Sequence, residues 1–121
     1  MTYKIYIAGP ISSNPKGSKA LFEAEEERVY RCMNDYYLSL MDNDIKVINP
    51  RALEVPKGTK SEEVWRVMMR KSLKKFLKCD ALVLMDGWEG SNGARLEKCL
   101  ARDLGMLIFA WSSSCGMYYS L

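Results

Sequence analysis

Two hydrophobic patterns alternate along this chain. Short, nearly continuous apolar runs predict buried β-strands, whereas longer segments with an apolar residue at every third or fourth position predict helices. The predicted strands span residues 3–8, 45–48, 81–85 and 106–110. The predicted helices span residues 18–41, 61–78 and 93–104. Residues 111–121 show neither period, and no linker or repeat divides residues 1–121, so we expect one domain.

The regular alternation of strands and helices predicts an α/β fold, in which a parallel sheet carries helices on both faces. We expect a four-stranded, flavodoxin-like or Rossmann-like sheet with the strand order 2-1-3-4. In that order residues 3–8 and 81–85 form neighbouring central strands. The loops after Ala8 and Met85 then meet at the sheet edge where such folds bind their ligands.

The loop after the third predicted strand has the residues of an anion-binding site. Glycine-rich residues 86–90 lead to Ser91 and Asn92, which are both favourable N-caps, and the helical pattern begins at Gly93. A helix start presents free backbone N–H groups and a positive dipole end to an anion. The Ser91 hydroxyl and the Gly93 amide are therefore candidate contacts for a phosphate or a sugar hydroxyl.

Glu97 falls on the apolar face of the predicted third helix. Helical spacing places it with Gly93, Leu100, Ala101 and Leu104. A carboxylate on a buried face costs free energy unless it is paired. Two interpretations follow: a partly exposed Glu in a local ion pair, or a site carboxylate at the mouth of the preceding loop.

Two aromatic residues bear on the second interpretation. Tyr6, near the end of the first predicted strand, either hydrogen-bonds Glu97 or is an ordinary core aromatic. A Glu that is oriented by a Tyr hydroxyl can serve as a nucleophile or a base, and glycosyl chemistry commonly uses such a carboxylate. Trp88, in the glycine-rich loop, either stacks on a base or covers the core.

Composition narrows the chemistry. The chain has no histidine, which excludes Ser-His and Cys-His catalysis and most zinc sites, and we expect neither metal nor cofactor. The net charge of +3 does not favour nucleic acid as a partner. The acidic run in residues 23–27 and the basic cluster in residues 70–78 are typical of solvated helix faces, the basic one alternatively of a phosphate-binding face. Four unpaired cysteines and the lack of a signal peptide or membrane-spanning segment indicate a cytoplasmic protein.

Several motifs together resemble a known family. They are Lys4-Ile5-Tyr6-Ile7-Ala8-Gly9-Pro10, Asn49-Pro50, Cys79-Asp80 and the stretch from Gly87 to Ala101 that contains Trp88, Ser91, Gly93, Ala94 and Glu97. Over about residues 3–110 the chain resembles the nucleoside 2-deoxyribosyltransferase-like superfamily. Within that superfamily it is most similar to a branch of small phage and bacterial proteins.

The resemblance implies a role for each motif. Glu97 attacks or stabilises the anomeric carbon of the sugar, and Tyr6 orients Glu97. Ser91 stands where relatives that bind free nucleosides have an Asp, and a Ser there favours a nucleoside 5′-monophosphate. The other substrate contacts that we expect are Gly9, Pro10, Ile11, Ser12, Trp88, Gly93 and Ala94.

Ser72 departs from the family pattern. Relatives carry an Asp, the general acid for the leaving base, eight residues before the Asp that opens the third strand, which here is Asp80. A Ser cannot protonate a base at neutral pH. Either Asp86 acts in its place, or the reactive base needs no acid, or turnover is lost.

We therefore expect hydrolysis or transfer at the N-glycosidic bond of a (deoxy)nucleoside monophosphate. The alternatives are a non-catalytic module that binds or sequesters nucleotides, and a structural protein that kept only the fold. The resemblance also implies a homo-oligomer, a dimer or larger, because relatives complete their sites across a subunit interface. The aromatic tail with Trp111, Tyr118 and Tyr119 is either a contact there or a frayed terminus.

Overall fold

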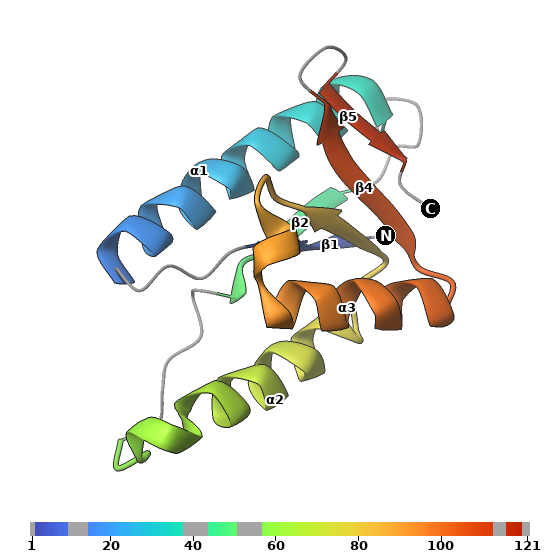
Figure 1. Ribbon diagram of the computed structural model, residues 1–121. Coiled ribbons are helices and arrows are strands. Elements are labelled where there is room, and N and C mark those ends of the chain that lie inside the picture. Colours follow the sequence, from blue (N-terminus) through green and yellow to red (C-terminus); the bar gives the residue numbers. More distant parts are fainter. Residues whose placement is uncertain (1, 10–14, 38–43, 51–56, 113–115, 120–121) are drawn as a thin grey trace.

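The computed structural model describes residues 2–9, 15–37, 44–50, 57–112 and 116–119, which form a five-stranded sheet with helices on both faces (Figure 1). The strands are β1 (Thr2–Ala8), β2 (Asp44–Ile48), β3 (Ala81–Leu84), β4 (Leu107–Ser112) and β5 (Gly116–Tyr119). Their order is β2-β1-β3-β4-β5. β1 pairs in parallel with β2 and β3, and β3 pairs in parallel with β4, whereas β5 is antiparallel to β4.

The mixed α/β class is confirmed, but the predicted four-stranded, all-parallel sheet was wrong. The chain adds β5, which places Tyr119 opposite Phe109 and Met117 opposite Trp111. Met117 is buried in the core. β5 has the sequence Gly-Met-Tyr-Tyr and lacks the continuous apolar run that identified the equally short β3, so its pairing with β4 identifies it where its sequence does not.

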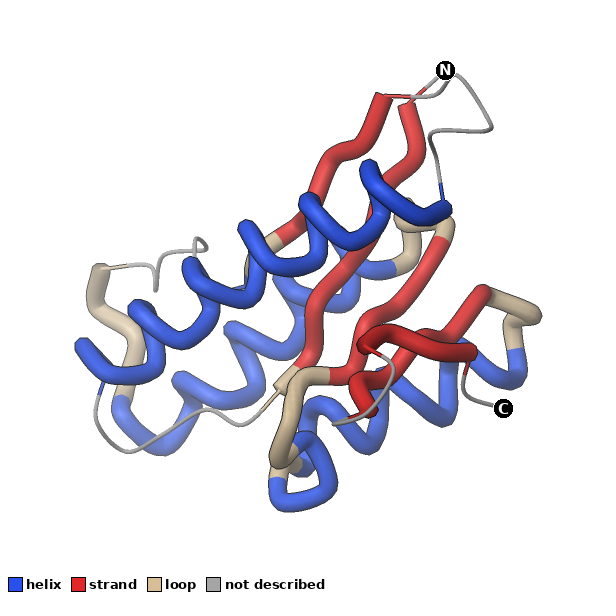
Figure 2. Tube along the Cα trace, turned by 90° about the horizontal axis from the view of Figure 1, so that it is seen from above, coloured by secondary structure: helices blue, strands red, loops and turns tan. Residues whose placement is uncertain are grey.

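Within the described part of the chain, three α-helices cover the sheet. They are α1 (Pro15–Cys32), α2 (Val64–Phe76) and α3 (Asn92–Asp103). A π-helical turn, Met33–Tyr37, continues α1, and 3-10 turns at Ser61–Glu63 and Trp88–Gly90 precede α2 and α3. α1 lies on one face of the sheet and α2 with α3 on the other (Figures 1 and 2). Residues 38–41 of the first predicted helix lie outside the described residues. Among the described residues, none of the helices combines the length and the apolar character that crossing a membrane would require.

Alternation along β1 and β3 separates two cores. Ile5, Ile7, Ala81 and Val83 face α1, with Phe22 and Val29 of that helix. Tyr6, Ala8, Leu82 and Leu84 face the other side, with Phe76 of α2 and with Ala94 and Ala101 of α3. Successive side chains of a strand point to opposite faces, and both faces are covered here, so the strands read as unbroken apolar runs. The same alternation directs Tyr6 toward α2 and α3.

The loops that follow β1 and β3 lie side by side. Ala8 is paired with Leu84, and the Met85 amide donates to the Ala8 carbonyl at 2.7 Å. A Cβ atom at Gly9 would lie 2.6 Å from the Met85 sulfur, which is closer than real Cβ contacts allow. Glycine at position 9 therefore lets the two loops meet, as the predicted neighbouring strands require.

Candidate functional site

A cavity of about 290 Å³ opens beyond the C-terminal ends of the central strands, between β1, α2 and the start of α3. The residues that line it come from five segments of the chain: Tyr6, Ala8, Gly9, Phe22, Pro50, Trp65, Met68, Met69, Ser72, Gly90, Ser91, Asn92, Gly93, Ala94 and Glu97. This is the place where open α/β sheets bind ligands. Of the predicted site residues, the cavity brings together Tyr6, Gly9, Ser91, Gly93, Ala94 and Glu97.

Glu97 is buried, with 5% of its surface exposed. It lies on the buried face of the amphipathic helix α3. One of its oxygens, Oε2, is buried and has no hydrogen-bond partner in the structure. Burial raises the pKa of the Glu97 carboxyl to about 7, and a hydrogen bond from Tyr6 lowers it in part. The inward orientation of Glu97 is therefore confirmed, and its Oε2 atom is an unsatisfied buried group on a residue that lines the cavity.

Tyr6 links Glu97 to Ser72. The Tyr6 ring is 1% exposed and contacts Phe76 edge to face, with 5.3 Å between ring centroids. Its hydroxyl is hydrogen-bonded to both Glu97 and Ser72. Burial first, and then the nearby Glu97, raise the pKa of Tyr6, so the phenol stays protonated and donates to Glu97. The bond with Ser72 acts in the opposite direction on that pKa, as expected when the Ser72 hydroxyl donates to the phenol oxygen.

Ser91 caps α3. Its hydroxyl oxygen accepts from the Ala94 amide at 3.2 Å, and its carbonyl accepts from the Arg95 amide at 3.0 Å. The first amides of a helix have no intrahelical acceptor, which leaves those of Asn92 and Gly93 to face a ligand. The Ser91 hydroxyl keeps its proton for donation while it accepts from Ala94. The start of α3 thus offers several donors to an anion in the cavity.

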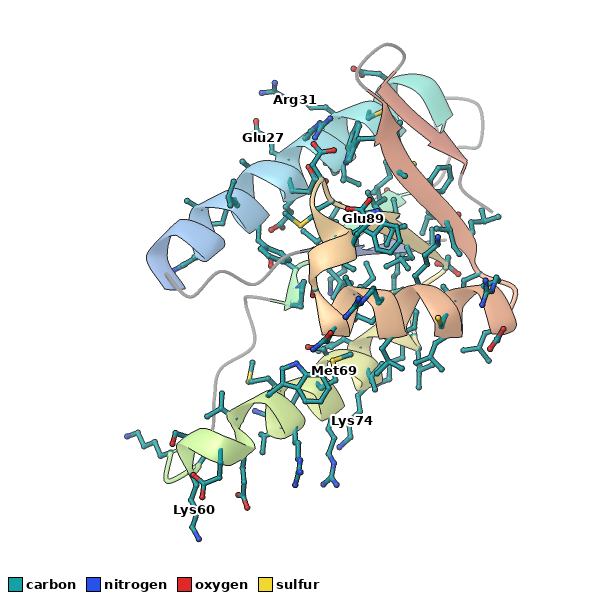
Figure 3. All side chains as sticks on the ribbon, viewed as in Figure 1. Glu27, Arg31, Lys60, Met69, Lys74 and Glu89 are labelled. Carbon is teal, nitrogen blue, oxygen red and sulfur yellow. The ribbon has the colours of Figure 1, made fainter. Side chains whose placement is uncertain are left out.

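The wall opposite α3 was missed by sequence reasoning, except for Ser72, which the family resemblance placed at the position of the general acid. α2 contributes Trp65, Met68, Met69 and Ser72 to the cavity, at helical spacings of three, four and seven. Figure 3 shows Met69 in the space between α2 and α3. A Cβ atom at Gly93 would lie 3.3 Å from the Met69 sulfur, so glycine there allows this close approach. The spacing in the sequence marks an inward helix face, but it does not reveal whether that face meets the sheet or a cavity.

One expected contact, Trp88, lies elsewhere. Trp88 does not line the cavity; it packs against the core on the α2 and α3 side, and the Lys98 ammonium group lies 4.7 Å from its ring centroid. Pro10, Ile11 and Ser12 lie outside the described residues.

Asp86 and Asp80 also lie away from the cavity. Asp86 is exposed, does not line the cavity, and lies 3.4 Å from an Arg28 nitrogen. It is therefore not placed to act as the acid for a leaving base. Asp80 accepts from the Lys4 amide at 2.8 Å, which ties the start of β3 to β1.

Two predictions about helix faces were wrong. The acidic run on α1 is not uniformly solvated, because Glu25 is buried and accepts from the Trp111 indole nitrogen at 2.6 Å. Its neighbour Glu27 is exposed and pairs with Arg31 on the outside of α1 (Figure 3). Leu104, expected on the apolar stripe of α3, is exposed because α3 ends at Asp103 and Leu104 lies beyond the last turn.

The described residues contain no group of three carboxylate or thiol side chains placed to hold a metal ion. A sequence-family model described as "Domain of unknown function (DUF4406)" matches residues 3–110, which includes every residue that lines the cavity. No curated protein and no solved structure matches the chain. Since the family match spans most of the sequence, this protein belongs to the DUF4406 family.

Proposed function

We propose that this protein is a nucleoside 2-deoxyribosyltransferase-like enzyme that hydrolyses or transfers the N-glycosidic bond of a (deoxy)nucleoside monophosphate. The observation that carries the proposal is the buried Oε2 atom of Glu97, which has no hydrogen-bond partner and belongs to a residue that lines the cavity. A buried carboxylate oxygen without a partner costs free energy. A sugar carbon that develops positive charge would stabilise it, as in glycoside cleavage.

In this mechanism Glu97 is the nucleophile and Tyr6 is its positioning residue. The Tyr6 hydroxyl holds one carboxylate oxygen and leaves Oε2 free to attack the anomeric carbon. The attack breaks the bond to the base and forms a glycosyl ester on Glu97, which water or an acceptor base then resolves. Because the carboxyl must be ionised to attack, activity should rise with pH through about 7.

The phosphate would lie at the start of α3. None of the described residues that line the cavity is Lys or Arg. The Ser91 hydroxyl, the amides of Asn92 and Gly93 and the helix dipole would therefore supply the binding. The base would lie against Trp65, Met68 and Met69 of α2, which together form an apolar wall.

The direct test measures free base released from a panel of ribo- and deoxyribonucleoside monophosphates. Glu97→Gln should abolish release, whereas Glu89→Gln, at an exposed carboxylate that does not line the cavity, is the matched control. Equal release by the wild type and Glu97→Gln, or no release across the panel, would overturn the enzymatic proposal.

A non-catalytic nucleotide-binding module is the second candidate, and Ser72 is the observation that favours it. Ser72 stands where the resemblance places a catalytic Asp, and its hydroxyl is hydrogen-bonded to Tyr6. This candidate predicts calorimetric binding of a nucleotide that is recovered intact after long incubation. Recovery of free base would exclude it.

The expected homo-oligomer and cytoplasmic location are part of the same proposal. β5 and β2 form the two edges of the sheet, and edge strands are common contacts between copies of a chain. Trp111 is already engaged with Glu25 and Arg28 within the chain, which leaves β5 itself as the tail's contribution to an interface. Light scattering measures the mass in solution, and a monomeric mass would contradict the oligomer.

A further inference from the structure

Ser72 bears on whether the cavity can supply a proton to a leaving base. It is 8% exposed, lies on α2 and lines the cavity with Tyr6 and Glu97. Its hydroxyl is hydrogen-bonded to Tyr6 and lowers the pKa of Tyr6, as a hydroxyl that donates to the phenol oxygen does. A serine hydroxyl does not ionise at physiological pH, so Ser72 holds Tyr6 in place but donates no proton to a substrate.

No other described acid replaces it. Among the described residues that line the cavity, the ionisable side chains are Glu97 and Tyr6. The Tyr6 proton is held by Glu97, and Glu97 itself must attack as a carboxylate. Asp86 lies outside the cavity beside Arg28, and Glu89 is exposed and does not line it.

We propose that the substrate is an N-glycoside whose aglycone is a heteroaromatic cation, which leaves as a neutral molecule and needs no proton from the protein. This inference rests on the proposed N-glycosidic activity. The inference specifies the charge of the aglycone, which the proposed activity does not specify.

The movement of electrons during cleavage of the carbon–nitrogen bond explains why the aglycone must be a cation. A lone pair of Glu97 Oε2 forms the new bond to the anomeric carbon, and the electron pair of the carbon–nitrogen bond stays on the leaving nitrogen. With a cationic base, such as an N7-alkylated purine or an N-linked pyridinium ring, that pair neutralises the base. With an ordinary purine the base would leave as an anion and would need an acid. Water then attacks the glycosyl ester, which restores the Glu97 carboxylate and releases one proton to solvent.

The cavity wall suits a cation as well. It contains one buried carboxylate and, among its described residues, no Lys or Arg. A cationic ring would offset the cost of burying Glu97. Trp65, Met68 and Met69 line the cavity, so an aromatic ring and two polarisable sulfurs are available to such a ring.

The test compares substrates that differ in this charge. Guanosine 5′-monophosphate and 7-methylguanosine 5′-monophosphate form one pair, and uridine 5′-monophosphate and nicotinamide mononucleotide form a second. Each is assayed for base release, as the ribonucleotide and the 2′-deoxyribonucleotide, with release by Glu97→Gln subtracted as the blank. We expect the cationic member of at least one pair to react roughly 100-fold faster or more, the usual contribution of a general acid.

Equal or faster release from the uncharged members would overturn this inference and leave the N-glycosidase proposal standing. Release from none of the substrates by the wild type would overturn both. These two failures are therefore distinguishable.

The variant Ser72→Asp provides a second test, because it places a carboxylic acid at position 72 of the cavity. The rate ratio between the cationic and uncharged members should narrow by about tenfold or more, whereas Ser72→Asn, a neutral variant of the same shape, should not narrow it. Near-ultraviolet circular dichroism checks that both variants fold. A folded Ser72→Asp variant with an unchanged ratio would contradict the proposal, and if it does not fold the wild-type ratio decides.

Discussion

Glu25 and Glu97 are buried to the same extent on opposite faces of the sheet, with 6% and 5% of their surfaces exposed. Glu25, on α1, has partners for both oxygens: the Trp111 indole nitrogen lies 2.6 Å from Oε2, and an Arg28 nitrogen lies 3.3 Å from Oε1. Glu97, on α3, has Tyr6 on one oxygen and nothing on the other. Burial raises the pKa of both carboxyls, so neither burial nor the pKa direction distinguishes them.

The two carboxylates differ in the partners that their oxygens find within the chain. The Arg28 guanidinium group stacks on the Trp111 ring at 3.5 Å from its centroid, so Glu25, Arg28 and Trp111 form a closed cluster between α1 and β4. Because both oxygens of Glu25 are satisfied within the chain, this carboxylate holds α1 to β4 and has no unsatisfied oxygen to offer a ligand. The incomplete carboxylate borders a cavity, and a missing partner is therefore a better marker of a functional site than burial.

Exchanging each Glu for Gln gives the largest expected contrast. Glu97→Gln should lower base release by a factor on the order of 10⁴ or more, as for other enzyme nucleophiles. Glu25→Gln should keep the activity but lose about 1–3 kcal/mol of unfolding free energy, because it breaks a buried charged contact. Base-release assays and urea unfolding of both variants measure the contrast. Loss of activity in both variants would remove the distinction between the two carboxylates.

The pH dependence of stability should separate Glu97→Gln from the wild type. The folded-state pKa of Glu97 is raised from an ordinary 4.5 to about 7, so the folded protein binds the proton more tightly than the unfolded chain. Its contribution to stability is therefore fully present below pH 4.5 and is lost as the pH rises through about 7. From pH 4.5 to pH 8 the wild type should lose on the order of 3 kcal/mol relative to Glu97→Gln. Urea unfolding at these two pH values checks this, and parallel changes in both proteins would contradict it.

Trp111→Phe should damage the closed cluster without touching the cavity. The indole N–H that donates to Glu25 is lost, and a buried carboxylate oxygen is left without that donor. We expect a loss of about 1–3 kcal/mol in urea unfolding. Trp65→Phe is the matched control, since Trp65 is 53% exposed and its replacement should change unfolding by less than about 0.5 kcal/mol. Equal losses would show that the Glu25 bond is not what stabilises this face.

Substitutions at Ser91 should have the smallest effect on stability, and they separate capping from ligand binding. Ser91→Ala removes the acceptor for the Ala94 amide and should cost about 1 kcal/mol. Ser91→Asp keeps a capping oxygen but places a negative charge beside the expected phosphate, so it should keep the stability and weaken binding of a monophosphate. Calorimetry with a nucleoside and its monophosphate distinguishes the two effects. Unchanged preference for the monophosphate in Ser91→Asp would place the phosphate elsewhere.

Much of the cavity could be predicted from the sequence because its elements are local. The apolar runs identified the four parallel strands, and Ser91 with the glycine-rich loop identified the start of α3. Helical spacing placed Glu97 inward. β5 was missed because it lacks a continuous apolar run like that of the equally short β3. The apolar wall of α2 was missed because the spacing of an inward helix face does not show whether that face meets the sheet or a cavity.

The α/β class, the Ser91 cap and the inward position of Glu97 follow from the sequence alone, because they depend on local propensity and on the periods of helix and strand. Which of the two buried carboxylates has partners for both oxygens depends on tertiary packing. Glu25 and Trp111 are 86 residues apart in the chain, and their contact exists only when β4 joins the sheet beside β3. The same holds for Ser72, whose hydroxyl reaches Tyr6 because α2 packs over β1. Partners that packing brings together leave no periodic signal in the sequence. These partners make Glu25 a structural residue and leave Glu97 as the candidate nucleophile.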